Sequence, residues 1–333
     1  MTTRIRSRTL GRTGLAVSEL GFGAWGIGGG LWGKPDDAAA KSALKKALQL
    51  GVTFFDTALA YGDGHSERLI AETVREAGFR RNVTIATKIP PKNREWPARH
   101  DAPIRDVFPK DWIIACTEKS LKNLDCDFLD LQQLHVWSPR WLAETEWIDT
   151  LRELQLAGKI RYLGVSLNDH EPDAALDLVR SGWVDTLQVI FNLFDQSPAV
   201  RLFPLAQEHR IGIIARCPFD EGGLTGALRE DTVFPSGDWR REYFKGERLR
   251  ETVRRAEALN VLVGGGIDSL AHAALQFVLS HHVLSEPSVS TVIPGMRRRE
   301  HVEANCRFSL GPALSAETME RAKSHAWERN FYD

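Results

Sequence analysis

Three apolar segments of the chain each end in a titratable residue of a different type. Asp56 follows VTFF, Lys88 follows VTIAT and His135 follows FLDLQQL, while Tyr61 lies in the loop-like stretch after Asp56. A carboxylate, an ammonium group, an imidazole and a phenol are groups that enzymes use to move protons. A single polar residue after an apolar run is often only the start of a loop, but four of complementary types are more informative. We therefore take these residues as the candidate catalytic group.

Together, the four side chains suit the protonation of a carbonyl oxygen. A tyrosine with a pKa of about 10 is a weak acid near neutrality, and a neighbouring lysine ammonium favours its ionised form. A carboxylate such as Asp56 keeps that lysine charged and in place. His135 can hydrogen-bond the substrate oxygen and fix its angle. None of the four can supply a hydride, so the reduction of a carbonyl requires a cofactor.

The elements that must position these residues alternate between strand-like and helix-like patterns. Apolar, β-rich runs predict strands at 20–25, 52–58, 83–89, 128–136, 161–167, 186–192, 212–218 and 290–295. Longer helical patterns predict helices at 36–50, 66–78, 110–124, 141–157, 172–181, 198–209, 246–259, 269–282, 299–306 and 315–329. Strands that alternate with helices favour parallel pairing.

This alternation predicts an α/β fold, a (β/α)8 TIM barrel that occupies residues 1–333 as a single domain. Turn signals at Gly11 and Gly14 predict an N-terminal β-hairpin within 4–18 that plugs the barrel's bottom, and extra helices close the C-terminal end. The main competing arrangement is an open, doubly wound sheet. In a barrel, catalytic residues sit at the carboxyl ends of the strands, which is where the candidate catalytic group falls.

Composition narrows the class of protein and of partner. The formal net charge is −1, so no overall field draws the chain to nucleic acid or to an anionic membrane. The N-terminal stretch is basic and polar, and no apolar run approaches the roughly 20 residues that span a bilayer. The cysteines show no C-x-x-C spacing, and His135 is the only histidine at a strand end. We expect a cytoplasmic protein with a small-molecule partner and no metal, of undetermined oligomeric state.

Longer segments around the candidate residues resemble the aldo-keto reductase superfamily. The motifs cover nearly the whole chain in the family's order: RTLGRTGLAVSELGFGAWGIGG, FDTALAYG, IATKI, DLQQLHVW, GVSLND, LQVIFN, PFDEGGLTG and TVIPGMRRREHVEAN. The resemblance implies a (β/α)8 barrel that binds NADPH without a Rossmann domain and reduces aldehydes or ketones. It also implies that Tyr61 is the general acid and base, that Lys88 and Asp56 tune it, and that His135 orients the carbonyl.

The resemblance further implies which residues hold the cofactor. The nicotinamide carboxamide would be held by Ser166, Asn168 and Gln188. Residues 216–226 would pass along the pyrophosphate, among them Arg216, Pro218, Gly223 and Gly226. The adenosine end would be surrounded by Gly295, Arg297, His301 and Asn305. Independently, three arginines at 297–299 follow a predicted strand and begin a predicted helix, a setting that suits a phosphate. NADP(H) is the expected cofactor, with NAD(H) as the alternative.

Some positions depart from the family pattern. Arg216 stands where many members carry an aromatic residue that stacks on the nicotinamide, although a planar guanidinium can stack as well. Leu167 separates Ser166 from Asn168, which are neighbours in many relatives. His301 stands where arginine or glutamine is common. These departures leave the preference between NADP and NAD open.

The substrate pocket is predicted from long loops and large aromatic residues. The stretches 90–109 and 219–245 exceed ordinary loop lengths, and long loops after barrel strands are often lids or substrate-binding elements. Trp25, Trp96 and Trp137 are the expected pocket walls.

The sequence therefore predicts an oxidoreductase that uses NADP(H) to reduce aldehydes or ketones, or that runs in reverse on sugars or polyols. The first alternative is a cofactor-binding, redox-sensing regulatory subunit with little turnover. The second is a metal-dependent barrel hydrolase or isomerase, which would need clustered His, Asp or Glu ligands. The physiological substrate and the direction of the reaction are open.

Overall fold

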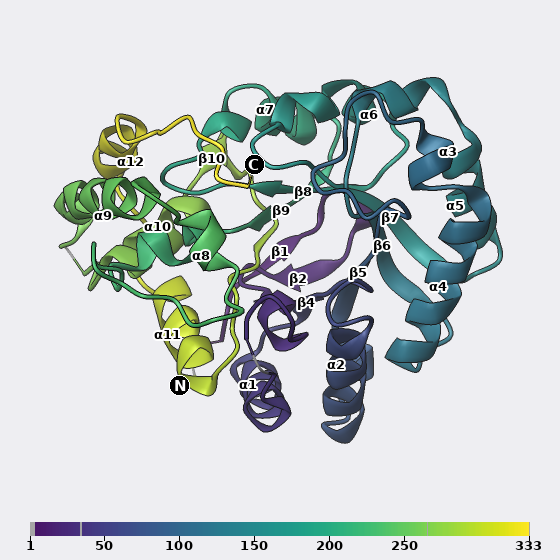
Figure 1. The fold of residues 1–333 in the computed structure, drawn as a ribbon, viewed down its shortest axis with the longest axis horizontal. Coiled ribbons are helices and arrows are strands. Elements are labelled where there is room, and N and C mark those ends of the chain that lie inside the picture. The colour runs from purple at the N-terminus through teal and green to yellow at the C-terminus, as the bar shows by residue number, and fades with distance from the viewer. Residues whose placement is uncertain (1–3, 34, 265, 333) are drawn as a thin grey trace.

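The computed structural model describes residues 4–33, 35–264 and 266–332. Its centre is an eight-stranded sheet, ordered β12–β9–β8–β7–β6–β5–β4–β3, in which every pair is parallel. Parallel bridges join Leu20 to Val292 and Gly23 to Gly295, so the first and last strands meet and close the predicted barrel (Figure 1). The strands are β3 (Phe22–Gly23), β4 (Phe54–Asp56), β5 (Thr84–Ile89), β6 (Leu129–Leu134), β7 (Ile160–Ser166), β8 (Thr186–Ile190), β9 (Gly212–Arg216) and β12 (Thr291–Val292).

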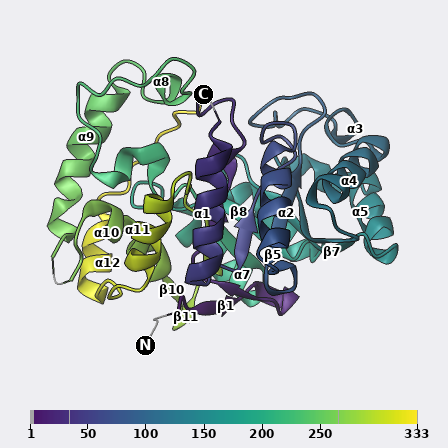
Figure 2. The same cartoon turned by 90° about the horizontal axis from the view of Figure 1, so that it is seen from below.

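Helices surround the barrel on the outside (Figure 1). The longer ones are α1 (Asp37–Leu50), α2 (His65–Glu76), α4 (Lys110–Leu124), α5 (Glu146–Leu156), α9 (Arg248–Ala258), α10 (Leu270–Leu279) and α11 (Arg299–Ser309). The shorter ones are α3 (Ile104–Val107), α6 (Leu176–Ser181), α7 (Leu202–Glu208), α8 (Arg240–Tyr243) and α12 (Ala316–Lys323). Figures 1 and 2 both place α9, α10, α11 and α12 together on one side of the barrel, where they form the predicted C-terminal addition.

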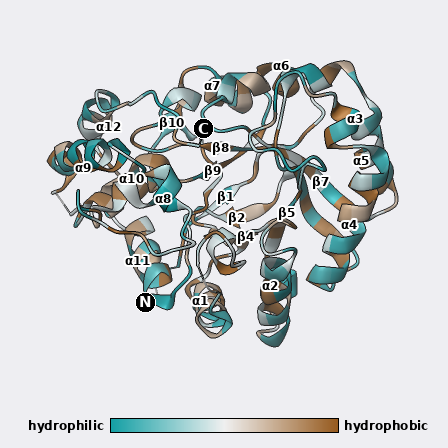
Figure 3. Cartoon of the chain, viewed as in Figure 1, coloured by the Kyte–Doolittle hydropathy of each residue, from teal (hydrophilic) through white to brown (hydrophobic). Residues whose placement is uncertain are grey.

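Local sequence explains where the helices begin and which face they bury. The Asp36 carboxylate accepts a hydrogen bond from the Ala39 amide at 2.9 Å, and α1 ends at Gly51, whose φ of 91° is left-handed. In α2 the buried residues recur at a spacing of three and four, as expected for one face of a helix: Ser66, Leu69, Ile70, Thr73 and Val74. Hydrophilic and hydrophobic residues accordingly alternate along the outer helices (Figure 3). Within the described residues, no helix is long and apolar enough to cross a membrane.

The predicted N-terminal hairpin is present and closes one end of the barrel. It consists of β1 (Ser7–Thr9) and β2 (Ala16–Ser18), paired antiparallel. Leu10 and Val17 are fully buried and pack inside the barrel against residues of several strands, Phe54, Ala86, Leu131, Ile214 and Ile293. The hairpin thus fills the end of the barrel opposite the carboxyl ends of the strands.

Two predicted helices end earlier than the sequence pattern indicated. The helix predicted at 315–329 ends at Lys323, because Trp327 hydrogen-bonds the Phe194 carbonyl through its backbone amide and the chain continues without helical structure. The helix predicted at 269–282 ends at Leu279, and the next residues form a small hairpin of β10 (His282–Val283) and β11 (Glu286–Pro287). The loops 90–109 and 219–245 also contain short helices that the sequence did not predict, α3 and α8.

A buried carboxylate ties the hairpin to the helices at its side. Glu19 is 1% exposed and accepts hydrogen bonds from Arg6 at 2.8 Å and from Arg8 at 2.9 Å. Arg8 also donates to the backbone carbonyls of Leu279 and Val289 at 2.8 and 2.9 Å. The Glu19 carboxylate therefore balances the charge of the Arg8 guanidinium, which joins the hairpin to α10 and to the segment before β12.

We predict that Glu19→Gln lowers the free energy of unfolding by about 3–5 kcal/mol, because it leaves the buried Arg8 charge without a counter-charge. Equilibrium denaturation followed by circular dichroism measures the change. The control is Glu320→Gln, which breaks the exposed Glu320–Lys323 pair and should cost less than about 1 kcal/mol. Equal effects of the two substitutions would contradict the assigned role of Glu19.

Candidate active site

Strand register explains why the candidate catalytic residues converge. Side chains two residues apart on a strand point to the same face, and Phe54, Ala86 and Leu131 point into the barrel. Asp56 and Lys88 follow the first two of these residues by two positions, and His135 follows Leu131 by four. All three therefore point inward, Asp56 and Lys88 one layer further toward the carboxyl ends of their strands and His135 two layers further. Tyr61 lies in the turn between β4 and α2.

Lys88 and Asp56 form a buried ion pair beneath Tyr61. The Lys88 ammonium donates to Asp56 Oδ2 and to the Thr57 carbonyl, both at 2.7 Å, and its side chain is fully buried. The second oxygen of Asp56 accepts a hydrogen bond from the Gln188 amide at 2.7 Å. The ammonium also lies 5.2 Å from the centre of the Tyr61 ring. The lysine is thus held in one position against the tyrosine.

Tyr61 and His135 face each other across the site. Their ring centres are 5.7 Å apart, at an interplanar angle of 73°. Burial raises the pKa of Tyr61 well above its usual value, with the Asp56 charge adding to the rise and Arg216 opposing it. Burial also lowers the pKa of His135 well below its usual value, assisted by the charges of Lys88 and Arg216. At neutral pH the site therefore presents a protonated phenol and a neutral imidazole.

The net effect on Tyr61 differs from the expectation that a neighbouring lysine lowers its pKa. The residue is buried, so desolvation of the phenolate outweighs the nearby positive charges. Burial likewise lowers the pKa of Lys88, while Asp56 favours its charged form. Tyr61 therefore holds its proton at rest, and the adjacent ammonium can stabilise negative charge that develops when the proton leaves.

The candidate catalytic group, hereafter the tetrad of Asp56, Tyr61, Lys88 and His135, lies at one end of a cavity of about 830 Å³. Near Tyr61 and His135 the walls include Trp25, Trp96, Ser166, Asn168, Gln188 and Arg216. Toward the other end they include Pro218, Gly295, Arg297, His301 and Asn305. The structure thus gathers the predicted catalytic and cofactor residues around one elongated space, with the fully buried Lys88 behind its wall.

Three predicted residues are placed differently from the expectation. Trp137, a predicted pocket wall, is fully buried in the core, where it packs edge-to-face on Trp141 and donates to the Ala174 carbonyl at 3.0 Å. Gly223 packs against α9, where an added Cβ would come within 2.7 Å of Thr252. Gly226 has a left-handed φ of 73° and ends the short helix Asp220–Thr225. Both glycines shape the loop from behind the cavity wall.

Two of the predicted carboxamide-binding residues already have partners within the protein. Asn168 accepts from the Ala98 amide at 3.2 Å and donates to the Ala98 carbonyl at 3.0 Å, which fixes the loop that carries Trp96. Gln188 donates to Asp56, as described above. Gln188 therefore connects β8 to the Lys88–Asp56 pair, and Asn168 connects the end of β7 to the loop that carries Trp96.

Arg216 forms a second ion pair in the cavity wall. Its guanidinium donates to Asp169 at 2.6 Å and to the Leu167 carbonyl at 3.3 Å. Asp169 also lines the cavity, and sequence reasoning did not identify it. The sequence signal that could have identified Asp169 is its position directly after Asn168, at the end of a barrel strand. The pair keeps the Arg216 charge balanced close to the tetrad.

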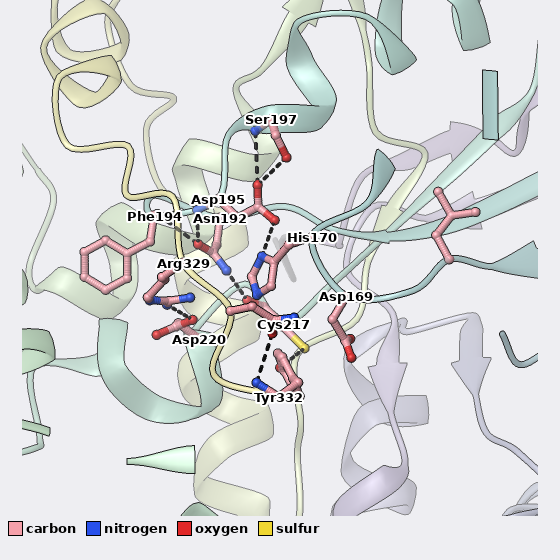
Figure 4. A network of polar contacts seen from close by, with 12 residues as sticks. Asp169, His170, Asn192, Phe194, Asp195, Ser197, Cys217, Asp220, Arg329 and Tyr332 are labelled. Carbon is pink, nitrogen blue, oxygen red and sulfur yellow. Dashed lines mark hydrogen bonds and ion pairs between the residues drawn. The ribbon is translucent and has the colours of Figure 1, made fainter. Parts of the chain in front are cut away.

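Sequence reasoning also missed a polar network in the cavity wall, to which Cys217 and Tyr332 belong (Figure 4). Glu221 accepts hydrogen bonds from the Tyr332 hydroxyl at 2.8 Å and from the Cys217 thiol at 3.3 Å. All three residues line the cavity. Burial raises the pKa of Glu221 to about 7. The acidic pair within PFDEGG was a signal for Glu221, but no local pattern connects Tyr332 to this site.

Aromatic side chains roof the cavity between the tetrad and this network. Trp25 lies 6.3 Å from Tyr61 and 5.4 Å from Trp239, and Trp239 stacks on Tyr332 at 5.5 Å. The chain segment of Trp32 pairs with that of Asp238 in an antiparallel bridge. The loop after β3, the loop 219–245 and the C-terminal segment therefore meet above the cavity.

The far end of the cavity suits a phosphate. Arg297 donates to the Trp32 carbonyl at 2.9 Å, and its Cγ and Cδ methylenes pack against Gly26, where an added Cβ would lie 2.5 Å from them. Burial and the nearby Arg240 charge lower the pKa of Arg297. Arg297 thus contributes positive charge to the cavity wall, while Arg240 is paired with Asp238 at 2.6 Å, and a cavity with such a guanidinium in its wall suits a phosphate-bearing cofactor. Within residues 4–33, 35–264 and 266–332, no group of three His, Cys, Asp or Glu side chains could hold a metal ion.

Comparison with known proteins gives the family. A sequence profile of the Aldo/keto reductase family matches residues 19–326. The chain belongs to this family. Aldo-keto reductases are oxidoreductases that use nicotinamide cofactors, in keeping with the resemblance of the sequence motifs.

Relatives of this aldo-keto reductase extend over almost its entire length. It is 31% identical to the aldo-keto reductase YhdN of Bacillus subtilis over 298 residues, 88% of this chain and 85% of the relative. It is 27% identical to the aldo-keto reductase yakc [NADP(+)] of Schizosaccharomyces pombe, over 87% of this chain and 83% of the relative. The solved glycerol dehydrogenase AKR11B4 of Gluconobacter oxydans has 25% identity and a TM-score of 0.75, covering 97% of this chain and 95% of that one.

We predict that His135 remains neutral throughout the range from pH 6 to pH 8. Its burial and the Lys88 and Arg216 charges lower its pKa, so the protonated form becomes populated only at lower pH. Histidine ring NMR signals measure this, with His135→Gln to assign the resonance and the unfolded chain, where histidine has a pKa near 6.5, as the reference.

Removal of the neighbouring charge provides a second arm of the same measurement. Lys88→Met should raise the His135 pKa, whereas Lys92→Met should leave it unchanged because Lys92 is a partly exposed lysine that pairs with Asp111. A complete His135 titration centred near 6.5 in the unsubstituted protein would contradict the neutral imidazole.

Proposed function

We propose that the protein is an NADP(H)-dependent reductase of aldehydes or ketones, in which Tyr61 gives the proton. The observation that carries the proposal is the buried Lys88–Asp56 pair, held against the Tyr61 ring at the end of a cavity whose other end is cationic. The same site can catalyse the reverse oxidation of an alcohol, such as a sugar or polyol.

In the proposed reaction, a reduced nicotinamide held beside Ser166, Gln188 and Arg216 would supply the hydride that the carbonyl carbon accepts. His135 donates a hydrogen bond to the carbonyl oxygen, and Tyr61 transfers its proton to that oxygen as negative charge develops there. The Lys88 ammonium stabilises the phenolate that remains, and Asp56 keeps the ammonium in place. The carbonyl group becomes an alcohol, and solvent returns a proton to Tyr61.

The substrate would enter between two indole rings. Trp25 lies beside Tyr61, and Trp96 lies 5.7 Å from the His135 ring at an interplanar angle of 82°. Both line the cavity, and Trp96 is 45% exposed. The slot between them is apolar, and it leads directly to the two groups that would bind the carbonyl oxygen.

The cofactor would occupy the length of the cavity. Ser166, Gln188 and Arg216 would border the nicotinamide, the loop 216–226 would follow the pyrophosphate, and Arg297 would bind the 2′-phosphate of NADPH. The positive charge of Arg297 supports NADP(H) over NAD(H), whereas the charge of the neighbouring Arg240 is paired with Asp238 at 2.6 Å. Titrations with NADPH and NADH, followed by a panel of carbonyls and sugars, test the preference.

We predict that Tyr61→Phe lowers kcat by on the order of 10²–10⁴-fold, because it removes the proton that the reaction consumes. The dissociation constant for NADPH should change by less than about threefold, since the aromatic ring remains. Steady-state assays and fluorescence titrations measure the two quantities.

The matched control is Tyr162→Phe, since Tyr162 packs against the interior cluster at the hairpin end of the barrel. Full turnover of Tyr61→Phe would exclude this tyrosine as the acid. Tight NADPH binding with negligible turnover across the whole panel would instead favour the redox-sensing alternative.

We also predict that NADPH binding weakens as the pH rises from 6 to 8. Glu221 lines the cavity beside the pyrophosphate loop, and its pKa of about 7 makes it neutral at pH 6 and charged at pH 8. A charged carboxylate there repels the diphosphate. Cys217, Tyr332, Asp220 and Arg216 also face Glu221, and Glu221→Gln isolates its contribution.

The quantity to compare is the ratio of the dissociation constants of the two proteins at each pH, because the titration of NADPH itself then cancels. The unsubstituted protein should lose affinity relative to Glu221→Gln by about threefold to tenfold between pH 6 and pH 8. A ratio that does not change with pH would rule out ionisation of Glu221 in the free protein.

A further inference from the structure

The C-terminal segment Trp327–Tyr332 returns from α12 to the cavity. The Trp327 amide donates to the Phe194 carbonyl, in the loop after β8, at 2.8 Å. Arg248 of α9 donates to the Phe331 carbonyl at 2.9 Å. Tyr332 then reaches the cavity wall. The segment thus spans from the C-terminal helices to the carboxyl ends of the barrel strands.

A buried ion pair joins this segment to the loop after β9. Arg329 and Asp220 contact each other directly, and their side chains are only 5% and 3% exposed (Figure 4). Tyr243 donates to the same carboxylate at 2.9 Å. The Arg329 guanidinium also lies 4.6 Å from the ring centres of both Trp327 and Phe331. Two charges buried this deeply require each other, so the contact fixes the segment and the loop together.

The segment makes a second contact with the loop through Tyr332. Its hydroxyl donates to Glu221 at 2.8 Å and lies 3.6 Å from the Cys217 sulfur. Its ring stacks on Trp239 at an interplanar angle of 21°. The residues that contact Tyr332 in this way belong to the middle of the cavity rather than to the Trp25–Trp96 slot.

The loop itself has a conformation that needs external support. Cys217, Asp220 and Glu221 have left-handed φ values of 53°, 48° and 52°. Residues with a Cβ are disfavoured in this region. Arg329 or Tyr332 contacts each of these three side chains. Between them lie Pro218 and Phe219, which line the cavity.

We propose that Arg329 and Tyr332 are positioning residues for the dinucleotide, because they hold the loop 217–222 in the conformation that lines the cavity. This inference rests on the proposed function, and it concerns cofactor binding rather than substrate selection. It predicts that disturbance of the C-terminal segment weakens cofactor binding while the affinity for the carbonyl substrate stays almost the same.

The experiment compares three proteins with the unsubstituted chain. The double variant Asp220→Asn/Arg329→Met removes the ion pair without leaving one buried charge, and Tyr332→Phe removes only the hydroxyl. Arg321→Met is the control, because Arg321 is an exposed arginine of the nearby α12. Within the described residues, its guanidinium hydrogen-bonds only the Val261 carbonyl. Each protein is assayed for its NADPH dissociation constant, its KM for a carbonyl substrate at saturating NADPH, and its unfolding midpoint.

We expect the NADPH dissociation constant to rise about tenfold in the double variant and about threefold in Tyr332→Phe. The KM for the carbonyl and the values of Arg321→Met should stay within about twofold of the unsubstituted protein. If the double variant fails to fold, the result for Tyr332→Phe decides. A raised KM with unchanged NADPH affinity would overturn the inference, since it would assign the segment to the substrate slot.

Unchanged NADPH affinity and unchanged KM in both variants would also overturn the inference, because the loop would then hold its conformation without the segment. Failure of the unsubstituted protein to bind either NADPH or NADH would instead refute the proposed function. That result is distinct, because it is seen before any substitution is made.

Discussion

The buried ion pair of Lys88 and Asp56 is the interaction on which the site depends. An ammonium inside a barrel is unfavourable unless its charge and its hydrogen bonds are all matched, and here Asp56 and Thr57 meet it at 2.7 Å. The match requires β4 and β5 to be in register and the hairpin to seal the other end against water. Because Gln188 binds the second oxygen of Asp56, β8 on the other side of the barrel is tied to the same pair.

Burial then determines the protonation states around this pair. It keeps Tyr61 protonated and His135 neutral, so the phenol O–H and one imidazole N–H remain as donors to an oxygen. The second pair, Arg216 with Asp169, adds a cation to the wall without a large net charge. The site therefore combines strong local electric fields with a net charge close to zero. Such an arrangement stabilises the charge that develops on a substrate in the transition state more than a charge already present in the ground state.

Local sequence predicted the parts of the structure that depend on local physics. The strands followed from apolar runs, α1 from Asp36 and Gly51, and the positions of Asp56, Lys88 and His135 from the carboxyl ends of the predicted barrel strands. The sequence could not show that Trp137 faces the helices, because both faces of such a strand end are apolar. It also could not place Tyr332, which meets Glu221 across a separation of 111 residues. Arg329 and Asp220 were hidden for the same reason, since each looks like an ordinary surface charge until the fold buries them together.

The hydrogen bonds of Asn168 affect how the sequence of this protein can change during evolution. The Asn168 side chain holds the Ala98 backbone through both amide atoms, so one residue just after β7 anchors the loop whose Trp96 lines the cavity. A contact with backbone tolerates any side chain at the positions it supports. Trp96 and its neighbours can therefore vary from one descendant to another while the loop keeps its path. New substrates could be acquired by changes at the mouth of the barrel, without disturbance of the inherited chemistry at its floor.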